Sequence, residues 1–309
     1  MKRLAMIFLP LVSLALPLPA AEKIRVSSFS TILTEIAQQV GGELVEVTSH
    51  IKPGVDPHEF EPTPEDLKTV SAAQLVLLSA KHMEGYVDKL EEASGGKATF
   101  LRVGDRFPSL KMTRPKSPEA AEEKKEPEPK KAGHDHGNED PHWWHSIGNM
   151  KRATISIQDA LIKLSGGHMR TFTANAARYM GKLDALQAWV RTEIAKLPKN
   201  KRKLVTSHDA FQYFAKDNGF AVYTVEGVST TDQPSSKKVA ELIQIIKAQR
   251  VKAIFAESLE NPKVLEEVTK ETGAVLGGQL YADGLGEGEA STYEGMVRHN
   301  VTTIVNALK

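Results

Sequence analysis

The chain has 309 residues, enough for a sizeable hydrophobic core and, on the usual relation of length to domains, for about two domains. Apolar residues make up 40% of it and charged residues 26%, and a net charge of +1 with mixed signs throughout implies no face-wide basic field, which disfavours nucleic acid as a partner. There is no cysteine, so we expect neither a disulfide nor a lipidated cysteine anchor, and any metal site has to use His, Asp and Glu.

The first residues, MKRLAMIFLPLVSLALPLPAAEK, are organised as a secretory signal peptide. Two basic residues precede an apolar segment at 4–18, and the small residues Ala20 and Ala21 follow. The apolar segment is short and broken by proline, which disfavours a membrane anchor. We therefore expect residues 1–21 to be removed on export to the periplasm.

Strand-like and helix-like segments alternate in the first part of the mature chain. Residues 23–29 and 44–51 are expected to form strands, and the apolar residues between them, within 30–41, recur at helical spacing. After a loop, Pro64 can begin a helix, and the continuous apolar run at 73–80 predicts a strand buried on both faces. This alternation predicts a parallel sheet covered by helices.

Residues 111–139 break the alternation. Lys, Glu and Pro dominate there, and the segment cannot bury enough apolar surface to offset the entropy lost on ordering. We interpret it as a mobile, charged insertion in the first lobe. Its two histidines, His134 and His136, are expected to bind metal weakly at most and to raise the metal concentration near a site.

The second half repeats the pattern after two helices. A helix is expected at 149–165, and a longer one at about 175–196 would span roughly 33 Å, enough to cross between lobes. Further strands are expected at 203–207, 221–227, 251–258 and 274–283, with helices at 208–219, 235–250, 261–273 and 293–309.

The sequence thus predicts an α/β fold with two lobes of mainly parallel sheet, joined by one long α-helix, and a metal site in the cleft between the lobes. The expected parts are a signal peptide at 1–21, an N-terminal lobe at 22–168, a linking helix at 169–197 and a C-terminal lobe at 198–309.

Four side chains occupy similar positions, near the C-terminal ends of predicted strands or in a rigid loop. His58 and His208 follow strands, Asp283 closes the last strand, and His142 lies in the PHWW segment after the insertion. In open α/β sheets, ligands bind outside the carboxyl ends of the strands, so these side chains from separate loops could meet between the lobes.

Three imidazoles and one carboxylate suit four-coordinate Zn²⁺. Each ring would need its second nitrogen held by a carboxylate or a carbonyl, and the sequence neighbours Asp56, Asp140 and Asp209 are candidates. An isolated loop histidine is more often hydrogen-bonded or solvated than ligating, so spacing alone leaves both interpretations open.

The remaining candidates receive weaker assignments. Trp143 and Trp144 are interpreted as packing residues, and Glu257 as a strand-end carboxylate that at best supports the ligands. The role of His145 stays undecided. Three histidines are not assigned to the site: His50, His168 and His299.

Four ordered motifs carry a family resemblance: DPHEFEPTPEDL at 56–67, DPHWWHS at 140–146, TSHDAFQYF at 206–214 and YADGLG at 281–286. With the charged insertion before the second D-P-H, they resemble the zinc- and manganese-binding proteins of periplasmic ABC importers over essentially the whole mature chain. The resemblance implies a monomeric periplasmic protein that binds Zn²⁺ with high affinity, delivers it to a membrane ABC permease and performs no catalysis.

Under this resemblance, the four family ligands match His58, His142, His208 and Asp283 in order. Manganese members typically carry Glu in place of His208, so a third imidazole favours Zn²⁺ over Mn²⁺. The sequence departs from the family pattern at His145 and at Gly284, where many members have Ser.

Three alternatives remain open at this point. The first is a manganese- or iron-binding importer component of the same fold. The second, from a different class, is a zinc-dependent hydrolase in which Asp283 acts as a base, although the chain has no HExxH motif. The third is an adhesin or a periplasmic metallochaperone.

Overall fold

The computed structural model describes residues 22–110, 139–225, 235–257 and 263–309. The predicted signal peptide and nearly all of the charged insertion, with His134 and His136, lie outside the described residues. Within the described ranges, the helices include none that is both long enough and apolar enough to cross a membrane.

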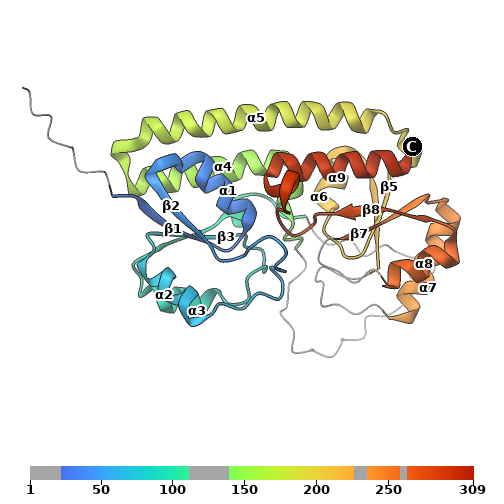
Figure 1. The fold of residues 1–309 in the computed structure, drawn as a ribbon, viewed down its shortest axis with the longest axis horizontal. Helices are drawn as coiled ribbons and strands as arrows, with labels where there is room; N and C mark the ends of the chain where they lie inside the picture. Colours follow the sequence, from blue (N-terminus) through green and yellow to red (C-terminus); the bar gives the residue numbers. More distant parts are fainter. Residues whose placement is uncertain (1–21, 111–138, 226–234, 258–262) are drawn as a thin grey trace, which may run out of the picture.

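The N-terminal sheet consists of four parallel strands in the order β2-β1-β3-β4. Helices α1 and α4 lie on one face of it and α2 and α3 on the other (Figure 1). The bounds of these elements are β1 Ile24–Ser28, α1 Thr31–Gly41, β2 Val45–Ser49, α2 Pro64–Ala72, β3 Leu75–Leu78, α3 Val87–Ser94, β4 Thr99–Arg102 and α4 Ile147–Leu164.

The C-terminal sheet repeats this order as β6-β5-β7-β8, again with parallel pairing. Helix α9 covers one face, and α7 and α8 lie together on the other. The bounds are β5 Lys203–Thr206, α6 Gln212–Asn218, β6 Ala221–Thr224, α7 Ser236–Gln249, β7 Ala253–Glu257, α8 Lys263–Thr272, β8 Val275–Leu280 and α9 Tyr293–Leu308. The predicted α/β class with two parallel sheets is confirmed.

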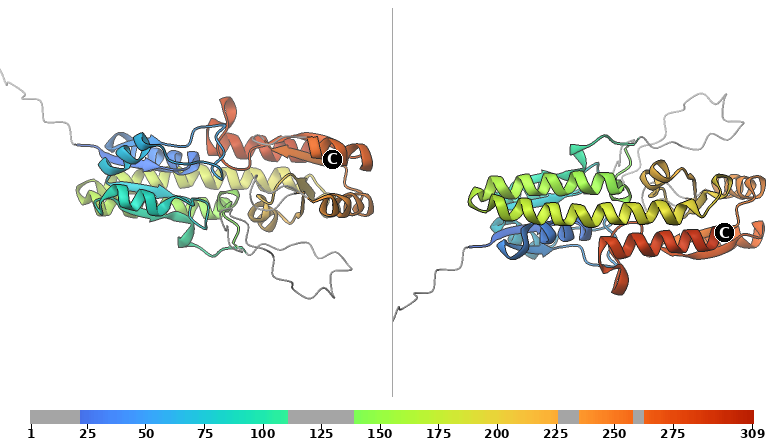
Figure 2. Two further views of the ribbon diagram at one scale, coloured as in Figure 1. Left: turned by 90° about the horizontal axis from the view of Figure 1, so that it is seen from below. Right: turned by 90° about the horizontal axis from the view of Figure 1, so that it is seen from above.

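Helix α5, Met169–Ala195, joins the two lobes (Figures 1 and 2). Its 27 residues span about 40 Å, and it packs against α1, α4 and α9. It begins six residues before the start expected from the proline-free run at about 175–196, because the short turn Gly166–His168 is all that separates it from α4.

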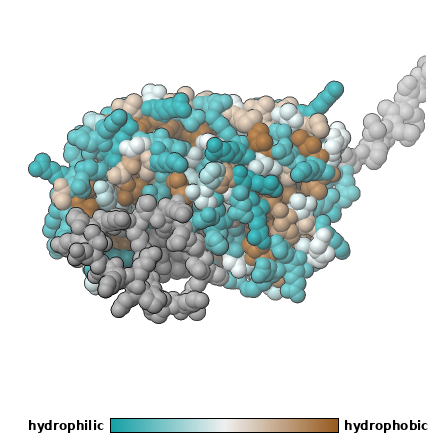
Figure 3. All heavy atoms as spheres, turned by 180° about the vertical axis from the view of Figure 1, so that it is seen from behind, coloured by the Kyte–Doolittle hydropathy of each residue, from teal (hydrophilic) through white to brown (hydrophobic). Residues whose placement is uncertain are grey.

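One hydrophobic cluster runs through both lobes. It includes Ile36 of α1, Leu186 of α5 and Ile304 of α9, all of them buried. Separate clusters lie beneath α2 and α3 in the first lobe and beneath α7 and α8 in the second. The two lobes therefore share a core on the α5 side. On the surface seen from behind in Figure 3, hydrophilic and hydrophobic residues intermingle.

The local sequence explains where several elements begin. Pro64 occupies the first turn of α2, as expected, and Thr63 and Asp66 form a reciprocal capping box around it. All four residues of β3 are buried, which agrees with the continuous apolar run.

Two elements of the first lobe were missed by the sequence analysis. Strand β4 has four residues, of which Leu101 alone is buried, so it gives hardly any apolar pattern. Helix α3 follows a turn in which Ala80, Lys81 and His82 all have φ between 57° and 68°. A third difference lies in the second lobe, where α6 starts at Gln212, so His208 is on a loop and not on a helix.

The turn at 80–82 is held by buried polar contacts. Consecutive left-handed non-glycine residues cost of order 1 kcal/mol each, so the surrounding structure must stabilise them. The carboxylate of Glu84 accepts the backbone N–H groups of Ser79 (2.5 Å) and Ala80 (2.9 Å). The carbonyl of Ser79 in turn accepts the indole N–H of Trp143 at 3.0 Å, which connects this turn to the PHWW segment.

Burial raises the pKa of Glu84 to about 7, although the two backbone hydrogen bonds act to lower it. The folded protein therefore holds a proton that the unfolded chain has already lost, so the free energy of unfolding falls as the pH rises from the ordinary carboxyl range to about 7. The resulting cost at pH 8 is of order 3 kcal/mol.

We expect Glu84→Gln to keep its free energy of unfolding as the pH rises, because glutamine retains a hydrogen-bond acceptor but cannot ionise. In urea unfolding series at pH 4 to 8, the variant should gain up to about 3 kcal/mol over the unaltered protein as the pH rises. Glu92→Gln, at an exposed position on the following helix α3, is the matched control. A difference that does not change with pH for Glu84→Gln would contradict the expectation.

Candidate metal centre

The structure brings together all four side chains singled out in the sequence, His58, His142, His208 and Asp283. One donor atom from each lies within 4.8 Å of the others. The side chains of all four residues are buried. The N-terminal lobe supplies His58 and His142, and the C-terminal lobe supplies His208 and Asp283.

The donor atoms are the Nε2 atoms of the three rings and Oδ1 of Asp283. The Nε2 atom of His142 lies 3.3 Å from that of His58 and 3.4 Å from that of His208. Oδ1 of Asp283 lies 3.2, 3.2 and 3.3 Å from the Nε2 atoms of His58, His142 and His208. Donors about 2.0–2.1 Å from a tetrahedral ion are about 3.3–3.4 Å apart, so these separations fit an ion of the size of Zn²⁺.

Asp140 holds His142 from behind. Its Oδ1 accepts both the backbone N–H and the ring Nδ1–H of His142, each at 2.9 Å. This contact fixes the tautomer and leaves Nε2 free to face the other three donors. The loop of His58 is organised in a related way, because Oδ1 of Asp56 accepts the backbone N–H of His58 at 2.8 Å.

The side chain that holds His208 is Glu257. Its sequence neighbour Asp209, the candidate named from the sequence, does not make this contact. Oε2 of Glu257 contacts Nδ1 of the ring, and Oε1 accepts the backbone N–H of His208 at 3.3 Å. Asp209 instead accepts a hydrogen bond from Gln212 at 2.7 Å. The sheet explains this arrangement, because Thr206 pairs with Phe255 in adjacent strands and His208 and Glu257 each lie two residues further on.

The loop of Asp283 is fixed by contacts with the other lobe. The carbonyl of Ala282 accepts the indole N–H of Trp144 at 2.8 Å, and Thr31 Oγ1 accepts the backbone N–H of Leu285 at 2.8 Å. A side chain at Gly284 would place its Cβ 2.7 Å from Thr31 Oγ1. Glycine, the residue at which the chain departs from the family pattern, therefore permits the close approach of α1 to this loop.

His145, which was undecided from sequence, has a structural environment. Its Nε2 donates to the carbonyl of Ala282 at 2.8 Å, and its ring lies 4.4 Å from that of Phe211. Burial, with a further contribution from His142, lowers the pKa of His145 to about 3. The ring is thus a neutral packing group that supports the Asp283 loop from outside the cluster.

Both tryptophans are buried and pack as expected, with Trp144 beside the ring of His142. Two of the histidines left out of the site are hydrogen-bonded elsewhere, His50 to Asp66 and His299 to the carbonyl of Gln279. The sequence had no signal for Thr31, whose contact depends on the packing of the two lobes.

Protons compete with a cation at this site. Burial alone would lower the pKa of His142, but Asp140 and Asp283 outweigh it and raise the value to about 9. Burial would likewise raise the pKa of Asp283, but the nearby histidines lower it well below its ordinary range. Because a cation needs neutral imidazoles, its affinity should fall as the pH falls below about 9, above the pH 6 at which free histidine would suggest the onset.

Comparison with known proteins places this geometry in one family. The family model described as zinc-uptake complex component A periplasmic (ZnuA) matches residues 26–307. The manganese-binding lipoprotein MntA of Bacillus subtilis is 35% identical, with 94% of this chain and 91% of the relative covered. The iron-binding protein YfeA of Yersinia pestis is 32% identical, with 93% and 87% covered.

Solved structures agree with the sequence comparison. The periplasmic zinc binding protein TroA from Treponema pallidum matches with a TM-score of 0.80 and 30% identity, over 93% of this chain and 99% of that one. A manganese-bound periplasmic metal binding protein from Candidatus Liberibacter asiaticus matches with a TM-score of 0.79 and 27% identity, over 93% and 100%.

The carboxylates behind the rings generate a prediction. Asp140→Asn and Glu257→Gln should each lower the affinity for a divalent metal roughly tenfold to a hundredfold, because they loosen the orientation and basicity of His142 and His208. Isothermal titration calorimetry measures the change. Asp209→Asn is the matched control, since Asp209 adjoins His208 but bonds Gln212. An equal loss in the control would contradict the assignment.

Proposed function

This chain belongs to the zinc-uptake complex component A periplasmic family, and on that premise we propose that it captures Zn²⁺ and delivers it to the permease of an ABC importer. Family membership makes the chain a metal-binding component of an ABC importer and not an enzyme, so the zinc hydrolase considered from the sequence is set aside. The observation that carries the proposal is the buried cluster of three imidazoles and one carboxylate.

We propose His58, His142, His208 and Asp283 as the ligands of the transported ion. Their donor atoms converge from four loops, and five pair separations of 3.2–3.4 Å support coordination with bonds of about 2.0–2.1 Å. The ion is cargo, so the site has to hold it against water and then release it.

The donor chemistry supports zinc over manganese. Imidazole nitrogen binds Zn²⁺ well, whereas Mn²⁺ favours carboxylate and carbonyl oxygen, and Zn²⁺ lies above Mn²⁺ in the general order of affinities. The relatives do not distinguish between the ions, because they include proteins described as manganese-, iron- and zinc-binding. A manganese- or iron-binding importer component of the same fold is therefore the alternative.

We further propose a monomer that acts in the periplasm after loss of residues 1–21. Its parts would be the N-terminal lobe at 22–168, the linking helix at 169–197 and the C-terminal lobe at 198–309. Helix α5 follows the strands of the first sheet in the chain, precedes those of the second and runs across both lobes in Figure 1, which supports these boundaries. The charged insertion at 111–139 falls within the first of these lobes.

The ligand set has a direct test. His58→Ala, His142→Ala and His208→Ala should each lower zinc affinity by roughly tenfold to a thousandfold, measured by competition with a chromophoric chelator. His50→Ala is the matched control, because His50 is also buried but its ring is hydrogen-bonded to Asp66, outside the cluster. Comparable losses in the control, or full affinity in any one of the three variants, would contradict the proposed set.

The choice of metal has a second test. In competition titrations, the unaltered protein should prefer Zn²⁺, and His208→Glu should move the relative affinity towards Mn²⁺ by roughly tenfold or more, because a carboxylate replaces an imidazole. His299→Glu adds the same charge at an exposed histidine outside the cluster and should leave the preference unchanged. Equal binding of Mn²⁺ and Zn²⁺ by the unaltered protein would favour the alternative.

A further inference from the structure

The four proposed ligands differ in their access to solvent. The side chains of His58, His142 and His208 are fully buried, and that of Asp283 is 2% exposed. Asp283 also lines a cavity of about 220 Å³ between the lobes, and the three histidines are not among the residues that line it. A water molecule occupies about 30 Å³ in the liquid, so the cavity has room for an ion with part of its hydration shell.

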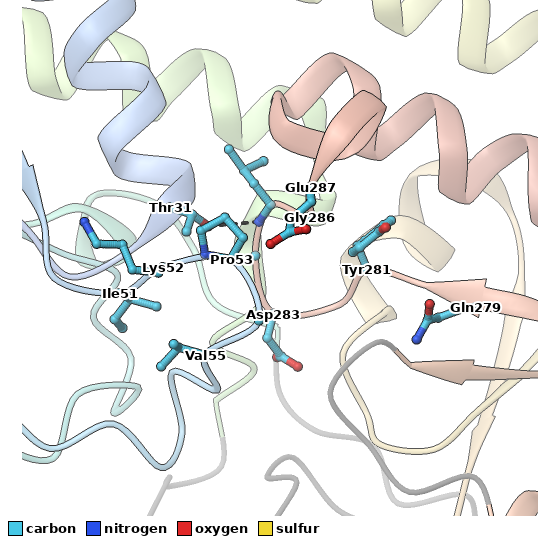
Figure 4. A pocket seen from close by; sticks show the side chains of 13 residues that line it. Thr31, Ile51, Lys52, Pro53, Val55, Gln279, Tyr281, Asp283, Gly286 and Glu287 are labelled. Atoms are coloured by element: carbon cyan, nitrogen blue, oxygen red, sulfur yellow. Dashed lines mark hydrogen bonds between the residues drawn. The ribbon is translucent and has the colours of Figure 1, made fainter.

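We infer that this cavity is the passage through which the ion reaches and leaves the cluster, and that Asp283 is the first ligand it meets. The inference rests on the proposed function and adds a route to it. The segment at 51–55 forms one wall and the loop at 279–287 forms the other. In Figure 4, Pro53 and Val55 lie on one side of Asp283 and Tyr281 and Gln279 on the other.

Two exposed charged side chains along the cavity should act on an incoming cation with opposite sign. Glu287 is exposed and lines the cavity four residues after the buried Asp283, so the same loop offers an outer and an inner carboxylate. Lys52 is exposed on the facing wall. Walls of low dielectric constant focus such charges, so Glu287 should attract an incoming cation and Lys52 should repel it.

The passage also has a steric element. The side chain of Val55 is 39% exposed and lies beside Asp283 in the cavity. A larger side chain at this position would narrow the route without touching the donor atoms. Because an obstructed route raises the same barrier for entry and for exit, association and dissociation should slow together and their ratio should change little.

Stopped-flow kinetics with Zn²⁺ and the mature chain test the steric element. Val55→Trp should slow association, and dissociation into excess chelator, in parallel by about tenfold or more. Ile155→Trp on α4 is the matched control, because Ile155 is also 39% exposed but does not line the cavity. Rates for Val55→Trp equal to those of the control, or a weaker affinity with unchanged association, would overturn the passage.

The two charged side chains provide a second test, in which each exposed charge is replaced by glutamine and no buried side chain is changed. At low ionic strength, Glu287→Gln should slow association and Lys52→Gln should speed it, by roughly threefold to tenfold, and added salt should suppress both effects. Glu289→Gln, exposed in the turn Gly288–Ser291 that follows this loop and outside the cavity, should change neither rate. Effects of the same sign at Glu287 and Lys52 would count against the route.

These measurements distinguish a failure of the proposed function from a failure of the passage alone. A titration in which the unaltered protein binds no zinc would overturn the proposed function and the passage with it. Tight zinc binding together with exchange rates that ignore Val55, Glu287 and Lys52 would overturn the passage and leave the proposed function standing.

Discussion

The structure depends on one electrostatic constraint, the meeting of four polar donor atoms in a place with almost no exposure to water. Burying three imidazoles and a carboxylate is unfavourable unless each group is held by a partner. Asp140 behind His142 and Glu257 behind His208 meet this requirement, and each of them also binds the backbone N–H of the histidine that it orients. The ring and the loop that carries it are therefore fixed by the same carboxylate.

The second requirement is that loops from two lobes stay in register with one another. Contacts across the lobe boundary provide this, including Tyr293 to the carbonyl of Trp144 at 2.7 Å and Ser146 to Asp217 at 2.6 Å. Behind them lies the hydrophobic cluster that both lobes share along α5. Opening the molecule by separating its halves would expose this apolar surface, so ion exchange through a cavity at the lobe boundary is compatible with the packing.

Much of the fold was readable from the sequence because its signals are local. Apolar periodicity, Pro64 and the long uninterrupted run of 175–196 predicted the alternation of strands and helices and the linking helix. Strand β4 was missed because an edge strand with one buried residue has no such pattern. The left-handed turn at 80–82 could not be foreseen either, since its stabilising partner Glu84 acts through buried hydrogen bonds.

The candidate site shows the same division. The positions of the four donors after strands, or in a stiff loop, were enough to group them. The support of His208 by Glu257 required the order of the strands, because it follows from the pairing of Thr206 with Phe255. In the same way, the packing of His145 against Phe211 and the approach of Thr31 to Gly284 depend on how the lobes meet.

The equal division of the donors, two from each half of the chain, also links the ion to the integrity of the whole molecule. A cation bound by both halves stabilises the native form by an amount that grows with its concentration relative to its dissociation constant. If either half unfolds, only two donors remain in place and that stabilisation disappears. The loaded protein should consequently melt as a single cooperative unit, whereas a half-folded chain would be unable to retain its cargo.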